Sequence, residues 1–219
     1  MRTLIVNCKN YPEVLGEGAV KLARAVAGVS GTRGVRAIVA PPTPLLSLVA
    51  AKTHAVVYSQ GVGTMSGERT TGAVLPGAVK AAGAVGTILN HSESKLSFNA
   101  LADLLPRLEG LEACLCASTS AEASKLSRLR PAYVAVEPPE LIGTGVAVSK
   151  ARPGLIRDTV VAVRRTGYTG GVLCGAGIVT GEDVKKAVEL GADGVLVASS
   201  VVKAKDWDDK VGELAHSLM

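Results

Sequence analysis

The stretch Gly171–Ser200, GVLCGAGIVTGEDVKKAVELGADGVLVASS, contains one complete strand–helix–strand unit. Two short apolar runs, GVLC and GVLVA, predict strands that begin at Gly171 and Gly194. Thr180 followed by Asp183 indicates a capping-box helix start, and Gly191 in ELGAD is placed like a glycine just past a helix end. A strand, a capped helix and a second strand at this spacing are typical of a parallel βα unit.

The same alternation continues over the whole chain. Helix signals lie between further apolar runs: Pro44 and Pro76 suit first-turn positions, and Thr119 with Glu122 suits another capped start. The other predicted strands are LIVN from Leu4, RAIVA from Arg36, AVVYS from Ala55, GTILN from Gly86, EACLC from Glu112 and YVAVE from Tyr133.

Eight such units predict a single α/β domain over residues 1–219, a closed (β/α)₈ barrel. The average unit is about 27 residues (219 divided by 8), so its helical parts are expected to be short. An open doubly wound sheet is the alternative. The first strand is not followed by the GxGxxG pattern of dinucleotide binding, which weakens that alternative.

Composition and charge narrow the possible partners. The net charge is +5, and the basic residues are scattered without the interleaved aromatics that stack bases, which argues against nucleic acid and suits an anionic small substrate. Uncharged apolar runs are too short to cross a bilayer, and the N-terminus lacks the apolar core of a signal peptide. We therefore expect a cytoplasmic protein without a membrane segment.

The cysteines and histidines do not have metal-site spacing. No CxxC pair is present, and the three histidines lie far apart, so no metal is expected. Cys114 and Cys116 would share one face of a strand, where burial as small hydrophobes is the favoured interpretation.

Glu137 is the first candidate for chemistry. In YVAVEPP, Tyr133, Ala135 and Glu137 share one strand face. If this is the interior face of the barrel, Glu137 projects from it at the carboxyl end of the sixth strand. The following prolines bias the backbone towards extended conformations and fix the direction of Glu137. The glycine-containing segment ELIGTG that follows suits a lid.

Other polar residues are expected at the same mouth. Asn7 and Lys9 share a face of the first strand, and His91 is in phase with Leu89 on the fourth. A carboxylate can remove a proton beside a carbonyl while an imidazole and an ammonium stabilise the oxygen. The last strands end in CGAGI and ASS, whose small residues let backbone amides approach a phosphate.

These segments together resemble the triosephosphate isomerase family, and within it the short archaeal-type branch. The resemblance covers almost the whole chain and rests on NCK at Asn7, LNHSE at Leu89, VEPPELIGTG at Val136, CGAGI at Cys174 and GADGVLVASS at Gly191. It implies an isomerase of glycolysis and gluconeogenesis that interconverts glyceraldehyde 3-phosphate and dihydroxyacetone phosphate through an enediolate, without a cofactor.

The resemblance also implies roles for individual residues. Glu137 would be the base, His91 a neutral electrophile, Lys9 a substrate-binding cation, and Asn7 a substrate-positioning residue. The use of a glutamate base beside a neutral histidine is well known for this family. The expected phosphate-binding and supporting positions are Gly143, Gly177, Ala198, Ser199, Ser92 and Glu93. The commoner family pattern has a serine at the position of Gly177 and paired glycines at Ala198–Ser199.

The segment GERTTGAVLP, Gly67–Pro76, resembles the protruding loop through which family members dimerise, with Thr71 reaching the neighbouring active site. The resemblance therefore implies a homo-oligomer, a tetramer as in the short branch, with a dimer as the fallback.

Several alternatives stay open at the level of sequence. Taken singly, Glu137 also fits a salt-bridged carboxylate, His91 a helix-start residue, and Ser92 with Glu93 helix caps. A Schiff-base aldolase on the same fold is one rival function, and a non-catalytic barrel that binds phosphate metabolites is another.

Overall fold

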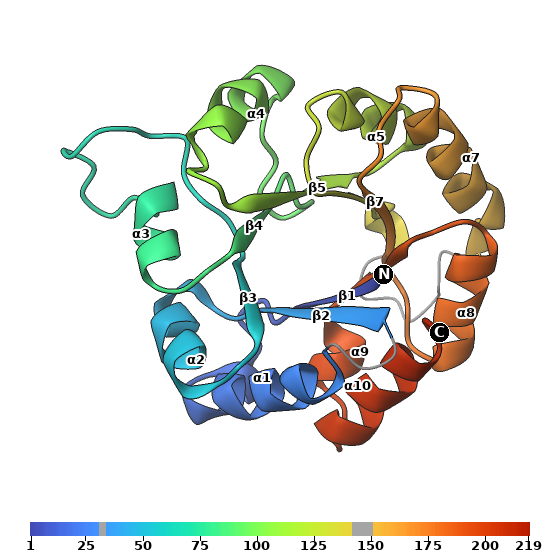
Figure 1. Cartoon of the computed structure of the whole chain (residues 1–219), viewed down its shortest axis with the longest axis horizontal. Helices are drawn as coiled ribbons and strands as arrows, with labels where there is room; N and C mark the ends of the chain where they lie inside the picture. Colours follow the sequence, from blue (N-terminus) through green and yellow to red (C-terminus); the bar gives the residue numbers. More distant parts are fainter. Residues whose placement is uncertain (31–33, 142–150) are drawn as a thin grey trace.

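A computed structural model describes residues 1–30, 34–141 and 151–219. Eight parallel strands form a closed barrel in sequence order, with β8 paired to β1 (Figure 1). The strands are β1 Arg2–Asn7, β2 Val35–Ala40, β3 Val56–Ser59, β4 Gly86–Leu89, β5 Glu112–Ala117, β6 Tyr133–Val136, β7 Gly171–Gly175 and β8 Gly194–Val197. Each overlaps a predicted run, so the (β/α)₈ prediction is confirmed and the open sheet is excluded.

Helices surround the barrel (Figure 1). They are α1 Glu17–Val29, α2 Leu46–Lys52, α3 Pro76–Ala81, α4 Phe98–Leu104, α5 Ser120–Ser127, α7 Pro153–Arg164, α8 Gly181–Glu189, α9 Ser199–Val202 and α10 Trp207–His216, with 3-10 turns η1 Pro12–Val14, η3 Thr43–Leu45, η4 Leu105–Arg107 and η5 Pro139–Leu141. Helix α3 has only 6 residues and α2 and α4 have 7 each, so the expectation of short helical units is confirmed. None of the helices described could cross a membrane.

The helix signals in the sequence correspond to observed ends. Helix α8 begins with a complete capping box, since the Thr180 hydroxyl accepts from the Asp183 amide and the Asp183 carboxylate accepts from the Thr180 amide. Gly191 follows α8 with a φ of +99°, a conformation that glycine adopts without strain. Pro44 lies inside the 3-10 turn η3, which begins at Thr43 and leads directly into α2.

The core has two layers because successive strand residues point to opposite faces. The barrel interior is filled by Ile5, Ile38, Ala40, Tyr58, Ile88, Cys114, Cys116, Tyr133, Ala135, Leu173 and Leu196. The alternate residues, such as Val6 and Val134, pack against the helices. Cys114 and Cys116 are buried side by side in the inner layer, as predicted.

The amino-terminal end of the barrel is closed by a polar cluster. Glu112 forms an ion pair with Arg36 at 2.8 Å and accepts a hydrogen bond from the Tyr58 hydroxyl, and Arg36 donates to the Tyr133 hydroxyl at 3.0 Å. Burial, followed by the bond to Glu112, raises the pKa of Tyr58 far above its ordinary value. These groups satisfy the polar ends of two tyrosines whose rings fill the interior.

We expect Gly194→Ala to lower the free energy of unfolding by about 3 kcal/mol. Gly194 lies opposite Thr3 where β8 closes onto β1, and an added Cβ would be 2.0 Å from the Thr3 carbonyl oxygen. Chemical denaturation measures the effect. The matched control is Gly28→Ala in α1, where nothing lies within 4 Å of the added Cβ and helix propensity favours alanine. Equal stability of Gly194→Ala and the wild type would contradict this account of barrel closure.

Candidate active site

A cavity of about 350 Å³ lies at the carboxyl ends of the strands. Residues from five barrel positions meet there, as expected for an active site in this fold. Its lining consists of Lys9, Tyr11, His91, Glu137, Ala176, Gly177, Ile178, Val179, Leu196, Val197, Ala198, Ser199, Ser200 and Lys203.

Glu137 follows β6 directly and faces this cavity. Its backbone amide donates to the Ala117 carbonyl of the neighbouring strand at 2.8 Å, and the residue is only 5% exposed. One carboxylate oxygen, Oε2, is buried without a hydrogen-bond partner among the described residues, and lies 3.7 Å from His91 Nε2. A buried carboxylate oxygen without a partner is unusual, and points to a group that receives a proton or a ligand.

Gly175 of β7 leaves room for Glu137. A Cβ at this position would lie 2.4 Å from Glu137 Cγ and 2.8 Å from its Oε1. The glutamate therefore takes its present position only because β7 ends in a residue without a side chain.

We expect Gly175→Ala to reduce turnover about 100-fold, because a shift of about 1 Å in a reacting group can have that effect. Steady-state kinetics of the purified variant measure it. Gly212→Ala in α10, where an added Cβ meets nothing within 4 Å, is the matched control. Full activity of Gly175→Ala would show that the position of Glu137 does not depend on this close contact.

His91 reaches the cavity by a route that strand phase does not predict. Leu89, which the sequence placed in phase with His91, packs in the outer layer against the helices, so that phase argument is wrong. Asn90 has a left-handed φ of +59°, which ends the strand and turns the next side chain towards the barrel mouth. Asparagine tolerates this conformation better than most residues, and was the signal that the sequence analysis missed.

The Asn90 side chain fixes this turn from three sides. Its amide nitrogen donates to the Cys116 carbonyl at 2.8 Å and to Glu122 Oε1 at 2.9 Å, and its oxygen accepts from the Leu96 amide at 2.9 Å. Asn90 is 2% exposed. The buried side chain thus ties the backbone next to His91 to β5, α5 and the segment before α4.

The hydrogen bond to His91 Nδ1 defines the state of the imidazole. The Glu93 backbone amide donates to Nδ1 at 3.2 Å, so Nδ1 acts as an acceptor and carries no proton. The Glu93 carboxylate is 3.8 Å from the same nitrogen, beyond hydrogen-bond distance. An uncharged imidazole therefore presents an Nε2–H group towards Glu137 and the cavity.

Lys9 enters the cavity from the loop after β1. Its φ is +48°, a strained conformation for a residue with a side chain, and its backbone amide donates to Asn7 Oδ1 at 3.0 Å. Its Nζ is 2.6 Å from Glu93 Oε1. Gln60, which sequence reasoning did not identify, donates to the Lys9 carbonyl at 2.8 Å. The buried Asn7 side chain thus supports Lys9 and does not itself line the cavity.

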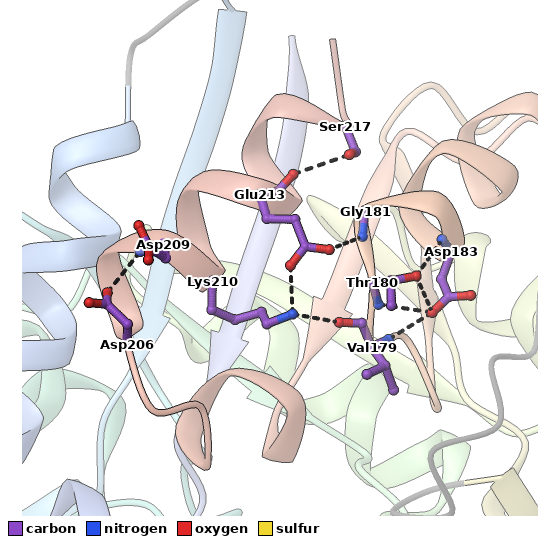
Figure 2. Close-up of polar contacts among 9 residues, drawn as sticks. All are labelled: Val179, Thr180, Gly181, Asp183, Asp206, Asp209, Lys210, Glu213 and Ser217. Carbon is purple, nitrogen blue, oxygen red and sulfur yellow. Dashed lines mark hydrogen bonds and ion pairs between the residues drawn. The ribbon is translucent and has the colours of Figure 1, made fainter.

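The β7–α8 loop forms another wall, and helices α8 and α10 hold it (Figure 2). The Val179 amide donates to the Asp183 carboxylate at 3.1 Å, and Lys210 Nζ donates to the Val179 carbonyl at 3.2 Å. Glu213 accepts from the Gly181 amide and from Lys210 Nζ, both at 2.6 Å. These contacts fix the loop that carries Gly177.

Gly177, Ala198 and Ser199 all line the cavity, as the sequence predicts. Ala176 and Gly177 have φ values of +68° and +69°, so the chain makes a tight left-handed turn beside the cavity. Backbone strain of this kind at a non-glycine residue gathers at functional sites.

The remaining predicted residues have different positions. Ser92 and Glu93 lie in a turn after His91 and do not cap a helix, because Ser97 is the residue that caps α4. Thr71 is exposed on the segment between β3 and α3, which projects away from the barrel (Figure 1). Gly143 lies outside the described residues.

The cysteines near the site are buried, and the pKa values of three of their thiols are raised, so the reactive thiolate form is disfavoured. The thiol of Cys116 has a raised pKa because of its hydrogen bond with Cys114, its burial and the nearby Glu137. Burial and then Glu137 likewise raise the pKa of Cys174, and burial raises that of Cys8 to about 12. Within the described ranges, no group of His, Cys, Asp and Glu side chains is arranged to hold a metal ion.

A closed (β/α)₈ barrel with a carboxylate, an imidazole and an ammonium at its carboxyl end defines a barrel protein equipped for proton transfer on a small molecule. The family model for triosephosphate isomerase matches residues 2–214, and the chain belongs to that family.

Individual relatives agree with the family model. The triosephosphate isomerase of Cenarchaeum symbiosum is 46% identical, covering 98% of this chain and 97% of the relative. That of Caldivirga maquilingensis is 44% identical over 99% and 97%, and that of Methanothermus fervidus is 41% identical over 96% of each chain. The relatives are mostly archaeal, which confirms the resemblance seen in the sequence.

Proposed function

We propose that this protein is an isomerase that interconverts D-glyceraldehyde 3-phosphate and dihydroxyacetone phosphate, a step of glycolysis and gluconeogenesis. The observation that carries the proposal is the buried, unpartnered Glu137 Oε2, which lies 3.7 Å from His91 Nε2 inside the cavity. Membership of the triosephosphate isomerase family supports it independently.

In this reaction Glu137 takes a proton from the carbon next to the substrate carbonyl. The electron pair of the broken C–H bond forms a carbon–carbon double bond, and the carbonyl oxygen becomes negatively charged. The His91 Nε2–H group donates to this oxygen, and the Lys9 ammonium stabilises its charge. The proton of the neighbouring hydroxyl group then passes to this oxygen, the neighbouring carbon–oxygen bond becomes the new carbonyl, and Glu137 returns its proton to the carbon that carried the original carbonyl. Electrons and atoms therefore balance within one molecule, and no cofactor is needed.

The substrate phosphate would lie against the backbone of Gly177, Ala198 and Ser199. These residues line the cavity, and small residues let backbone amides approach an anion closely. Gly143 belongs to the same proposal through the family resemblance.

The two rival functions have less support. A Schiff-base aldolase needs an uncharged lysine, whereas β6 leads into Glu137 and Lys9 is ion-paired with Glu93 at 2.6 Å. A non-catalytic binder would not need a carboxylate and an imidazole facing each other. The family and its named relatives support neither alternative.

The test is to incubate the purified protein with glyceraldehyde 3-phosphate in deuterated water with a metal chelator and without added cofactor. Dihydroxyacetone phosphate that carries solvent deuterium is the expected product, detected by NMR. A covalent adduct trapped by borohydride would favour the aldolase. Binding of a substrate analogue without turnover by a folded preparation would favour the non-catalytic binder.

Residues 1–219 are proposed to act as one domain within a homo-oligomer, a tetramer with a dimer as the fallback. The exposed projecting segment that carries Thr71 supports this part of the proposal. Light scattering at the assay concentration tests it, and a fully active monomer would contradict it.

A cytoplasmic location also belongs to the proposal, since all four cysteines are free.

A further inference from the structure

Lys203 is a cavity residue that neither the sequence motifs nor the proposed mechanism uses. It follows the short helix α9, and its backbone amide donates to the Ser199 carbonyl at 3.0 Å. The preceding carbonyl, of Val202, accepts from the Trp207 indole at 3.1 Å. The backbone next to Lys203 is therefore held between α9 and α10, although its side chain is exposed.

The Lys203 side chain has a defined direction. Its Nζ lies 4.9 Å from the centre of the Tyr11 ring, and Tyr11 also lines the cavity. A cation over an aromatic face is attracted to it without losing its charge. The described residues offer Lys203 no carboxylate partner, so its charge remains available to a ligand.

The charge balance of the cavity gives this lysine a function. Among the described lining residues, only Lys9, Lys203 and Glu137 carry formal charges. The formal charges of Lys9 and Glu137 cancel, and Lys9 Nζ also lies 2.6 Å from Glu93 Oε1, outside the lining. Lys203 therefore supplies the one formal positive charge of the described lining that Glu137 does not balance.

The order of strands around the barrel separates two regions of the cavity. Glu137 and His91 come from the ends of β6 and β4, whereas Gly177 follows β7, and Ala198, Ser199 and Lys203 follow β8, which lies opposite β4 in the barrel and pairs with β7 and β1. Lys203 therefore lies on the side of the small-residue backbone turns, away from the histidine.

We infer that Lys203, held over the Tyr11 ring, is a second phosphate-binding cation that favours dianionic phosphate esters as substrates of this cavity. This inference deepens the proposed function and rests on it for the identity of the substrate. The affinity of the cavity for inorganic phosphate can nevertheless be measured without any turnover.

The experiment compares Lys203→Met with Lys205→Met, an exposed lysine two residues further on that does not line the cavity. Both variants lose one positive charge, so effects of net charge cancel in the comparison. The readouts are the dissociation constant of inorganic phosphate, measured by calorimetry, and KM and kcat for the triose phosphate at low and high salt. Thermal melting shows that both variants fold.

At low ionic strength, Lys203→Met is expected to raise the phosphate dissociation constant and KM about fivefold, while kcat stays within about twofold. The expected effect is modest because the lysine side chain is exposed to water, which weakens its attraction for a phosphate dianion. The difference in phosphate affinity between the two variants should shrink in 0.5 M salt, because the screening length falls to about 4 Å and weakens the attraction between exposed charges. Lys203→Arg should recover most of the lost affinity, because arginine keeps the charge and can stack on Tyr11. Tyr11→Leu should weaken phosphate binding by a smaller factor.

Equal phosphate affinity and KM in Lys203→Met and Lys205→Met would overturn the inference. A loss of kcat without a loss of phosphate affinity would also overturn it, because Lys203 would then act on the reacting atoms. If the wild type bound phosphate through Lys203 but did not isomerise the substrate, the proposed function would fail while the phosphate-binding role would stand.

Discussion

Glu137→Gln is expected to lower kcat for triose phosphate isomerisation about 1,000-fold, with a smaller change in KM. Residue 137 packs closely against Gly175, where an added Cβ would lie only 2.4 Å from Glu137 Cγ. Glutamine has nearly the same shape as glutamate, so it fits the same space and the fold should be unchanged. It cannot accept the substrate proton, and a positioned general base contributes a factor of about 100 to 10,000. The loss should fall on kcat because the base acts only in the transition state.

A coupled assay measures this loss beside wild type prepared identically. Glu189→Gln, a change in an exposed glutamate that pairs with Lys186 on α8, is the matched control and should keep full activity. Binding of a substrate analogue should survive in Glu137→Gln, since the phosphate wall is untouched. Equal kcat in Glu137→Gln and wild type would remove Glu137 from the mechanism.

The barrel and the position of Glu137 could be predicted because both depend on local patterns. Strand residues alternate between two faces, so Val134 and Ala135 reveal which face Glu137 shares, and Pro138 fixes the exit of the chain. Short apolar runs with capped helices between them repeat along the chain, and eight such units favour a closed barrel, whereas the pairing of β8 with β1 is what excludes the open sheet.

Other features could not be predicted, since they depend on contacts between distant segments or on single backbone conformations. His91 enters the cavity because Asn90 turns the chain, and the Asn90 side chain finds its partners on β5 and α5. Strand phase alone therefore placed Leu89 on the wrong face. The contact between the Lys203 ammonium and the Tyr11 ring connects the end of α9 to the loop after β1. No spacing in the sequence indicates this contact.

Lys9→Met is expected to lower kcat/KM about 1,000-fold, through both kcat and KM. Removal of one preorganised group that stabilises developing charge has an effect of about 100- to 1,000-fold, and loss of a substrate-binding cation adds to it. The fold keeps Lys9 at a φ of +48°, held by Asn7 and Gln60, with its Nζ 2.6 Å from Glu93. A strained backbone with dedicated supports indicates that the position of this ammonium matters for chemistry.

The comparison of Lys9→Met with Lys203→Met separates charge stabilisation in the transition state from capture of the phosphate. Steady-state kinetics and phosphate binding should show a loss of kcat in the first variant, and a loss of affinity alone in the second. Lys9 follows β1, which pairs with β8, the strand that precedes Ala198 and Ser199, and it lines the same cavity as His91. We therefore expect its ammonium to act on both the phosphate and the reacting oxygen. If Lys9→Met raised only KM and left kcat intact, both lysines would serve phosphate binding, and His91 alone would have to stabilise the negative oxygen.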